Sequence, residues 1–299
     1  MRQAGYSSLE DALKEVLGNG CRVVSTIPVS GGDINRAYRL TLSDGQRVFL
    51  KSNTRDKLKM FQIEAEGLSA IAGTGAIRVP KVYCAGTDDR YGAFLLMENI
   101  DSVRPGLGYW DSFGHRLAAM HMADTSALTP GGIFGLSGDN YIGERPQDNT
   151  PGKSWVEFFR ERRLFPQFRD AMHYFEVEDR KRITQLLDHL PEYLIEPEYP
   201  SLLHGDLWSG NFITDDRGEA MLIDPAVYVG HAEADLAMTE LFGGFSSRFY
   251  DAYRESRPLQ PGYEDRRELY NLYHLLNHLN MFGASYLNSV RHIIQRYTD

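Results

Sequence analysis

Short apolar runs bounded by turn residues recur through the first hundred residues and predict β-strands. The runs cover residues 23–29, 37–42, 47–51, 79–83 and 93–97. Two other stretches have helical spacing: one that follows the capping residue Ser8, and residues 56–72. Together these patterns predict a small, mostly antiparallel sheet with one helix packed on it.

Beyond about residue 101 the hydrophobic spacing becomes helical over long stretches. It predicts helices over residues 110–121, 155–175, 179–190 and most of 266–297. Only residues 211–214 and 220–223 are expected to form strands in this half, as a hairpin around a turn at 215–218. The sequence therefore predicts an α+β protein with two lobes, a β-rich lobe of residues 1–100 and a larger, mainly helical lobe of residues 101–299.

The composition narrows the class of protein. The 299 residues are 42% hydrophobic and 24% charged, as is ordinary for a soluble globular protein. The formal net charge of -9 argues against nucleic acid or an anionic membrane as the main partner. No apolar run is long enough to span a bilayer, and the N-terminus lacks a signal-peptide core. We therefore expect a cytoplasmic enzyme in which Cys21 and Cys84 are reduced.

Three polar residues around the predicted C-terminal hairpin carry the clearest chemical signal. Asp206 and Asn211 lie in the stretch Leu-His-Gly-Asp-Leu-Trp-Ser-Gly-Asn at 203–211, and Asp224 lies in Leu-Ile-Asp-Pro at 222–225. Taken singly, Asp and Asn are common turn residues. As a spaced set they match a magnesium-dependent phosphotransferase, in which a carboxylate accepts the proton of the attacking hydroxyl and two oxygen ligands hold the metal.

The expected register of the hairpin brings two of these residues together. Pairing Thr214 with Glu219 across the turn would place Asn211 opposite Leu222. Asp224 lies two residues further on, hence on the same face of the ladder. The side-chain oxygens of Asn211 and Asp224 could then converge on Mg²⁺, which prefers a few protein oxygens together with phosphate and water.

A lysine and a glutamate in the N-terminal half form a second predicted pair. Lys51 alternates with its strand neighbours so that it shares a face with Phe49. Glu64 lies within an apolar helical stripe formed by Phe61, Leu68 and Ile71, where an unpaired charge would be costly. We expect a Lys51–Glu64 ion pair that presents the ammonium to nucleotide phosphates. The alternative is a lysine that extends to solvent and a glutamate at the edge of the stripe.

Two further segments are weaker candidates for nucleotide contacts. Gly31 and Gly32, followed by Asn35, precede the second predicted strand, and adjacent glycines let the backbone approach phosphate oxygens. The backbone of Glu98-Asn99-Ile100, at the connection between the predicted lobes, could bond an adenine edge. Each segment could equally be an ordinary turn or strand end.

With these candidate residues in this order along the sequence, the chain resembles the fructosamine (ketosamine) kinase family. This family has a protein-kinase-like fold related to aminoglycoside and choline kinases. The resemblance covers nearly the whole chain. Matching segments include residues 60–64, 77–80, 139–143, 201–211, 224–226, 230–237, 240–245 and 272–280.

The resemblance implies a role for each candidate residue. It implies Asp206 as proton acceptor, Asn211 and Asp224 as Mg²⁺ ligands, and ATP held by Lys51, Glu64, the glycine-rich segment and Glu98-Asn99-Ile100. It also implies supporting and substrate-binding residues, which are Asp235, His204 and Trp208.

Several of these supporting residues have an alternative interpretation. Asp235 resembles the buried aspartate that braces the catalytic loop, although it could instead cap a helix. His204 is expected to orient the loop, and Trp208 to line the sugar site or to lie in the core. His121 is interpreted as a packing residue. Asp33 stands where many relatives have cysteine, so a thiol switch is not expected there.

The sequence thus predicts an ATP-dependent kinase that phosphorylates a sugar hydroxyl, expected to be the 3-hydroxyl, of a ketosamine such as fructosamine or ribulosamine. Its partner would be a small sugar-amine or a glycated amine, and the sequence does not indicate an oligomeric state. Three alternatives remain open: an aminoglycoside- or choline-type kinase of the same fold, a non-catalytic nucleotide-binding regulator, and a metal-dependent hydrolase built on His204 and Asp206.

Overall fold

The computed structural model describes residues 6–29 and 35–299. By its internal contacts the chain forms two compact units. The N-terminal unit contains residues 1–109 together with 213–225, and the C-terminal unit contains 110–212 together with 226–299. The predicted lobe boundary near residue 100 remains a prediction, and the hairpin segment 213–225 belongs by contacts with the N-terminal unit.

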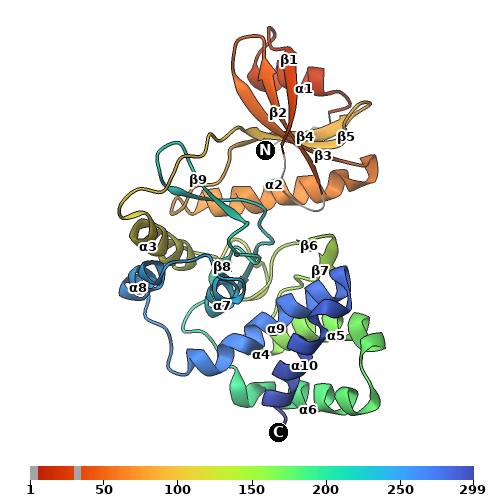
Figure 1. Ribbon diagram of the computed structural model, residues 1–299, viewed down its shortest axis with the longest axis vertical. Coiled ribbons are helices and arrows are strands. Elements are labelled where there is room, and N and C mark those ends of the chain that lie inside the picture. The colour runs from red at the N-terminus through yellow and green to blue at the C-terminus, as the bar shows by residue number, and fades with distance from the viewer. Residues whose placement is uncertain (1–5, 30–34) are drawn as a thin grey trace. The chain divides into compact units, whose positions relative to one another are not determined.

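The N-terminal unit is built on a five-stranded antiparallel sheet (Figure 1). The strands lie in the order β1 (Val23–Val29), β2 (Arg36–Leu42), β3 (Arg47–Asn53), β5 (Gly92–Glu98) and β4 (Val82–Asp88). Helix α1 (Leu9–Leu17) begins at Ser8, whose hydroxyl accepts a hydrogen bond from Asp11 N. A short 3₁₀ turn (Arg55–Lys57) leads into helix α2 (Leu58–Gly73), and the hairpin of β9 (Phe212–Thr214) and β10 (Ala220–Leu222) follows much later in the chain.

Alternation along the strands gives the sheet two buried faces. On one face Leu40, Val48 and Leu50 pack with α1 residues such as Leu13. On the other face the strands pack with Phe61 and Leu68 of α2, and Phe49 lies against this second cluster. Lys51 lies two residues after Phe49 and therefore points toward α2, as the sequence predicts.

The C-terminal unit is mainly helical. Its helices are α3 (Tyr109–His121), α4 (Trp155–Phe158), α5 (Phe165–Ala171), α6 (Val177–Tyr193), α7 (Glu233–Leu241), α8 (Ser247–Ser256), α9 (Tyr263–Phe282) and α10 (Leu287–Arg296). A π-helical turn (Phe159–Leu164) joins α4 to α5, and 3₁₀ turns cover Met172–Tyr174 and Ala284–Tyr286. Four short strands form two pairs, which are β6 (Asn140–Ile142) with β7 (Arg145–Gln147) and β8 (Ser201–Leu203) with β11 (Tyr228–Gly230).

The predicted fold class is confirmed, but several element predictions were wrong. The strand expected at residues 79–83 lies at Val82–Asp88, because Pro80 has no N–H to donate to a ladder. Helices α7 and α8 were missed. So were β6, β7, β8 and β11, since three-residue strands are too short for a periodic signal.

The register expected for the late hairpin was also wrong by one residue. Asp215 N donates to Glu219 O over 2.8 Å, so Glu219 lies opposite Asp215 and not opposite Thr214. Gly218 adopts a φ of +77° and makes the turn one residue shorter than expected. With this register Asn211 and Asp224 do not share a face of the ladder, so that prediction was wrong.

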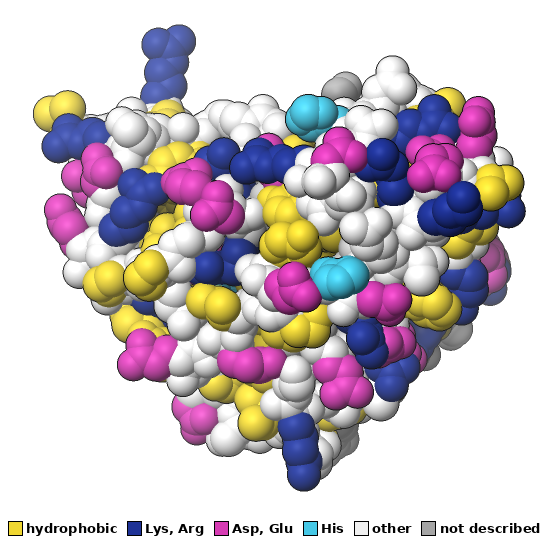
Figure 2. Space-filling model, turned by 90° about the horizontal axis from the view of Figure 1, so that it is seen from below, with side chains coloured by type: hydrophobic (Ala, Val, Ile, Leu, Met, Phe, Trp, Pro, Cys, Tyr) yellow, Lys and Arg dark blue, Asp and Glu magenta, His cyan; other side chains and the backbone are white. Residues whose placement is uncertain are grey.

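Charged side chains are mixed on the molecular surface drawn in Figure 2, where Lys and Arg lie interspersed with Asp and Glu. This face carries no broad field of one sign that would attract a polyanion.

Within residues 6–29 and 35–299, none of the helices combines the length and the apolarity needed to cross a bilayer. Cys21 and Cys84 are both buried free thiols, as predicted.

Two glycines with positive φ allow a matched test of the sheet. We predict that Gly45→Ala (φ +87°, open space) costs about 1 kcal/mol of unfolding free energy from backbone strain alone. Gly92→Ala (φ +70°) should cost about 3 kcal/mol, because its Cβ would lie 2.2 Å from Asn53 O. Urea denaturation of both variants measures the difference, and equal losses would contradict the packing of the β4–β5 turn against β3.

Candidate active site

A buried ion cluster joins three segments of the N-terminal unit. The Lys51 ammonium lies 2.5 Å from Glu64 Oε1 on α2 and is also bonded to the Asp224 carboxylate. The side chains of Lys51 and Glu64 are only 10% and 16% exposed, whereas that of Asp224 is 42% exposed. The predicted Lys51–Glu64 pair is thus present, and Asp224 is a second carboxylate partner that the sequence did not indicate.

The electrostatics of this cluster keep the lysine charged. Burial alone would lower the pKa of Lys51, but the Asp224 and Glu64 carboxylates raise it above its usual range. Burial raises the pKa of Glu64, and the Lys51 ammonium opposes that effect. Asp224 is the one residue other than glycine in the described chain with a positive φ, at 55°, a conformation that Asp tolerates better than most residues. Strained backbone of this kind is often found at functional sites.

Asp206 and Asn211 form a separate pair in the C-terminal unit. Asn211 Nδ2 donates to Asp206 Oδ2 over 3.0 Å and to Asp206 O over 2.8 Å. The amide nitrogen is therefore committed to Asp206, and Oδ1 is the atom of Asn211 that can act as a ligand. Asp206 N donates to His204 Nδ1 over 3.3 Å, so the buried His204 ring holds the loop that carries Asp206.

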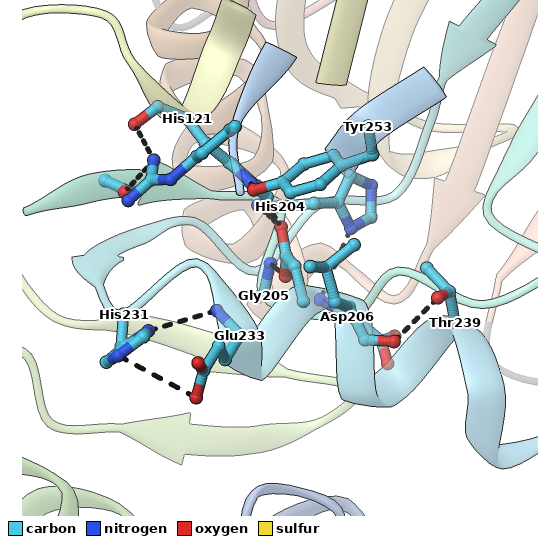
Figure 3. Close-up of polar contacts among 12 residues, drawn as sticks. His121, His204, Gly205, Asp206, His231, Glu233, Thr239 and Tyr253 are labelled. Carbon is cyan, nitrogen blue, oxygen red and sulfur yellow. Dashed lines mark hydrogen bonds and ion pairs between the residues drawn. The ribbon is translucent and has the colours of Figure 1, made fainter. Parts of the chain in front are cut away.

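Asp235 on α7 anchors the same loop. Its carboxylate accepts hydrogen bonds from His204 N over 2.6 Å and from Gly205 N over 2.9 Å. Figure 3 shows His204 and Gly205 of this loop close to Tyr253. Asp235 is the third residue of a helix whose cap is Ala232, so it is not the capping residue. Burial would raise the pKa of Asp235, but hydrogen bonds from His121 and the Gly205 backbone hold it below the usual range.

His121 is a polar member of this group and not merely a packing residue. Its Nε2 lies 3.2 Å from Asp235 Oδ2 and its Nδ1 lies 2.8 Å from Tyr253 Oη. A carboxylate only accepts, so Nε2 carries the proton and Nδ1 accepts from the tyrosine hydroxyl. Burial lowers the pKa of His121, which favours this neutral form.

Two glycines shape the Asp206 loop. Gly205 has a φ of +81°, and a Cβ there would lie 2.1 Å from Ala226 O. The Trp208 ring packs over Gly210, where a Cβ would lie 2.3 Å from the indole. Trp208 is 38% exposed and meets Phe242 edge to face, so it is a surface residue beside Asp206 in sequence and not a core tryptophan.

The predicted nucleotide-binding segments are placed only in part. The Asn35 side chain accepts a hydrogen bond from Asn53 Nδ2 over 2.8 Å. Gly31 and Gly32, with Asp33, lie outside the described residues. Of the connecting segment, Glu98 N donates to Lys81 O and the Asn99 side chain accepts from Arg39 Nε, while Ile100 is half-buried and outside any helix or strand.

The side chains present suit a metal ion that takes few ligands from the protein. Among the described residues there is no group of three or more His, Cys, Asp or Glu side chains arranged for a metal ion. A magnesium ion held mainly by phosphate and water, with one carboxylate and one amide oxygen, fits the side chains that are present.

Two buried histidines of the C-terminal unit are held neutral by their surroundings. His231 and His274 are about 4% exposed or less. Burial lowers the pKa of each to about 3. His231 Nε2 donates to Gln260 Oε1 and its Nδ1 accepts from Glu233 N, which fixes one neutral tautomer. Both rings resist protonation while the unit is folded.

The Asp235 anchor predicts a specific local loss. In Asp235→Asn one of the two carboxylate oxygens is replaced by an NH2 donor, which would face either the His204 or the Gly205 N–H group, so we expect about 3 kcal/mol lower unfolding free energy. Hydrogen exchange at residues 203–206 should also become faster. The control is Asp251→Asn, which removes the carboxylate of an exposed ion pair with Arg254. Unchanged exchange at residues 203–206 would contradict the anchoring role.

The neutral histidines predict an acid-dependent loss of stability. Unfolded histidine takes up a proton below about pH 6.5, whereas folded His231 and His274 stay neutral down to about pH 3. The free energy of unfolding is therefore unaffected by these rings above pH 6.5. Below that pH it falls by about 1.4 kcal/mol per pH unit for each ring. His231→Gln should remove about half of the combined slope between pH 6 and 5 in urea titrations, and His189→Gln, at an exposed site, should leave it unchanged. An unaltered slope in His231→Gln would contradict the prediction.

Comparison with known proteins gives the family of the chain. The model of the family described as fructosamine kinase matches residues 6–299. A probable ketoamine kinase of Synechocystis sp. is 40% identical, covering 98% of this chain and 97% of its own. A chloroplastic protein-ribulosamine 3-kinase of Arabidopsis thaliana is 39% identical, covering 96% of this chain and 88% of its own.

A solved structure shows the shared fold. A thermostable mutant of the aminoglycoside phosphotransferase APH(4)-Ia, in ternary complex with AMP-PNP and hygromycin B, superposes with a TM-score of 0.61 at 18% identity, over 97% of this chain and 99% of that chain. The kinase-like architecture is therefore common to both proteins. From the family match and these identities, the chain belongs to the fructosamine kinase family and is a phosphotransferase that acts on an alcohol group.

Proposed function

We propose that this protein uses ATP and Mg²⁺ to phosphorylate the 3-hydroxyl of a ketosamine, such as a fructosamine or a ribulosamine. The observation that carries the proposal is the Asp206–Asn211 pair on a loop fixed by Asp235, together with membership of the family. The acceptor is a small sugar-amine or a glycated amine. A cytoplasmic location goes with this function as part of the proposal.

Asp206 is the proposed acceptor of the hydroxyl proton. Asn211 donates to its carboxylate, so the orientation of the two oxygens is restricted before any substrate arrives. Phosphoryl transfer depends mainly on positioning and charge neutralisation, so a restricted carboxylate beside the attacking hydroxyl is the main requirement for the base.

Asn211 Oδ1 and the Asp224 carboxylate are the proposed ligands of Mg²⁺, which supplies charge neutralisation at the phosphates when bound. Lys51 provides the cationic contact to the nucleotide phosphates, and Glu64 keeps the ammonium in place once Asp224 turns to the metal. The backbone of Glu98-Asn99-Ile100 would meet the adenine, and Gly31, Gly32 and Asn35 would meet the phosphates. Trp208, which is 38% exposed, would line the sugar site.

A substrate panel tests the acceptor class. ATP consumption is measured with fructosyl-lysine, ribosyl-lysine, an aminoglycoside and choline, each with and without Mg²⁺. We expect turnover with the two ketosamines only, and only with the metal. Preferential turnover of the aminoglycoside or of choline would overturn the substrate assignment, and no turnover with any acceptor would favour a nucleotide-binding regulator.

The assignment of the base predicts a separation of binding from chemistry. In Asp206→Asn we expect kcat to fall about a thousandfold, within the range of general-base catalysis, while ATP affinity measured by calorimetry stays within about twofold. Asp111→Asn, at an exposed site on α3, is the matched control. An Asp206→Asn enzyme with near-normal kcat would exclude Asp206 as the base.

A further inference from the structure

The hairpin that ends at Asp224 packs with a unit from which it is distant in sequence. Residues 213–225 are more than a hundred residues downstream of the rest of the N-terminal unit. Ser102 Oγ donates to Thr214 O over 2.6 Å, and Leu222 N donates to Arg78 O over 2.9 Å. The hairpin is therefore held by the segment before β4, at Arg78, and by the segment after β5, at Ser102.

Arg78 contacts the hairpin through both its backbone and its side chain. Its backbone forms a parallel bridge with Met221. Its guanidinium is ion-paired with Asp215 and lies 3.6 Å from Asp216 Oδ1 and 3.9 Å from Glu98 Oε1. Arg78 thus contacts the turn of the hairpin, its returning strand and the end of β5.

The partner of Arg78 is a carboxylate that needs a cation. Asp215 is fully buried, and its Oδ1 accepts hydrogen bonds from Arg217 N and Glu219 N over 2.9 Å each. These bonds shape the turn but bring no positive charge. A buried carboxylate without a cation is costly. The Arg78 guanidinium, 24% exposed, supplies the charge.

The contacts of Arg78 with the hairpin lie close to Asp224 along the chain. Leu222, whose N–H is bonded to Arg78 O, lies two residues before Asp224. Asp224 has the unusual φ of 55°, and its carboxylate is bonded to Lys51. A backbone held in a strained conformation needs fixed attachments on its flank. Arg78 provides them at the turn and at Leu222.

We propose that Arg78 is a positioning residue for the metal-binding end of the site, which holds the 213–225 hairpin so that Asp224 stays in register with Lys51. The inference rests on the proposed role of Asp224 as a magnesium ligand. Because Arg78 also contacts Glu98, it links the segment expected to meet the adenine with the segment expected to hold the metal.

The first test compares two arginine variants of the full-length protein. Arg78→Met should raise the apparent KM for Mg·ATP about tenfold, a coupling typical of residues in one ion-pair network, with a smaller change in kcat. Arg55→Met is the control, since it breaks an exposed ion pair with Asp89 in the same unit. Arg78→Lys, which keeps the charge but not the planar fork, should give an intermediate KM.

A second measurement does not depend on activity. Hydrogen exchange of the segment 220–224 should become faster in Arg78→Met and stay unchanged in Arg55→Met. If Arg78→Met fails to fold because Asp215 is left unpaired, the double variant Arg78→Met/Asp215→Asn removes both charges, and it should still show the raised KM and the faster exchange.

The outcomes separate this inference from the proposed function. If Arg78→Met or the double variant matches Arg55→Met in KM and in exchange, Arg78 is not a positioning residue. A uniform fall in kcat without a change in KM or in exchange at 220–224 would also overturn the inference. If instead wild-type turnover proves independent of Mg²⁺, the proposed role of Asp224 fails, and the exchange data alone then decide whether Arg78 holds the hairpin.

Discussion

Three separate segments of the N-terminal unit meet at the buried ammonium of Lys51. Strand β3 supplies the lysine, helix α2 supplies Glu64, and the late hairpin supplies Asp224. A buried ammonium must be paired, so the position of α2 on the sheet and that of the hairpin are both tied to it. In the proposed function Asp224 binds the metal ion, and Glu64 then remains as the partner that keeps Lys51 charged. The same pair that stabilises the unit can thus present a cation to phosphate.

The C-terminal unit uses a buried carboxylate for a similar purpose. Asp235 accepts two backbone N–H groups of the loop that carries Asp206, and His121 accepts a hydrogen bond from Tyr253 while donating to Asp235. Each member of this chain has its donors and acceptors satisfied, which gives the loop one conformation. As the proposed base, Asp206 would therefore need little reorganisation before a hydroxyl binds, and phosphoryl transfer depends mainly on such positioning.

The sequence predicts the parts of this structure that depend on local periodicity. Strand alternation and the apolar stripe of α2 were enough to predict the Lys51–Glu64 pair, because both residues are constrained by their own element. The partners Asp224 of Lys51 and Asp215 of Arg78 lie 173 and 137 residues away, and no local pattern indicates them. The hairpin register was missed because it depends on the positive φ of Gly218, which shortens the turn.

Other parts of the candidate site could be anticipated only by resemblance. Spacing alone did not distinguish Asp235 as an anchor from Asp235 as a helix cap, and the choice required the position of α7. His121 gave no polar signal, because its partners Tyr253 and Asp235 come from two later helices. Long-range hydrogen bonds between buried side chains are thus the component of the site that the sequence does not encode in any local form.

The most direct test of the account is to map the product by ³¹P–¹H correlation NMR. Fructosyl-lysine is incubated with the protein, ATP and Mg²⁺, and the new phosphomonoester is assigned by its coupling to the sugar protons. We predict one product, with the phosphoryl group on the 3-hydroxyl, formed in equal amount to ADP. Phosphate on another hydroxyl would contradict the proposed position, and release of free phosphate without a sugar phosphate would contradict kinase activity toward ketosamines.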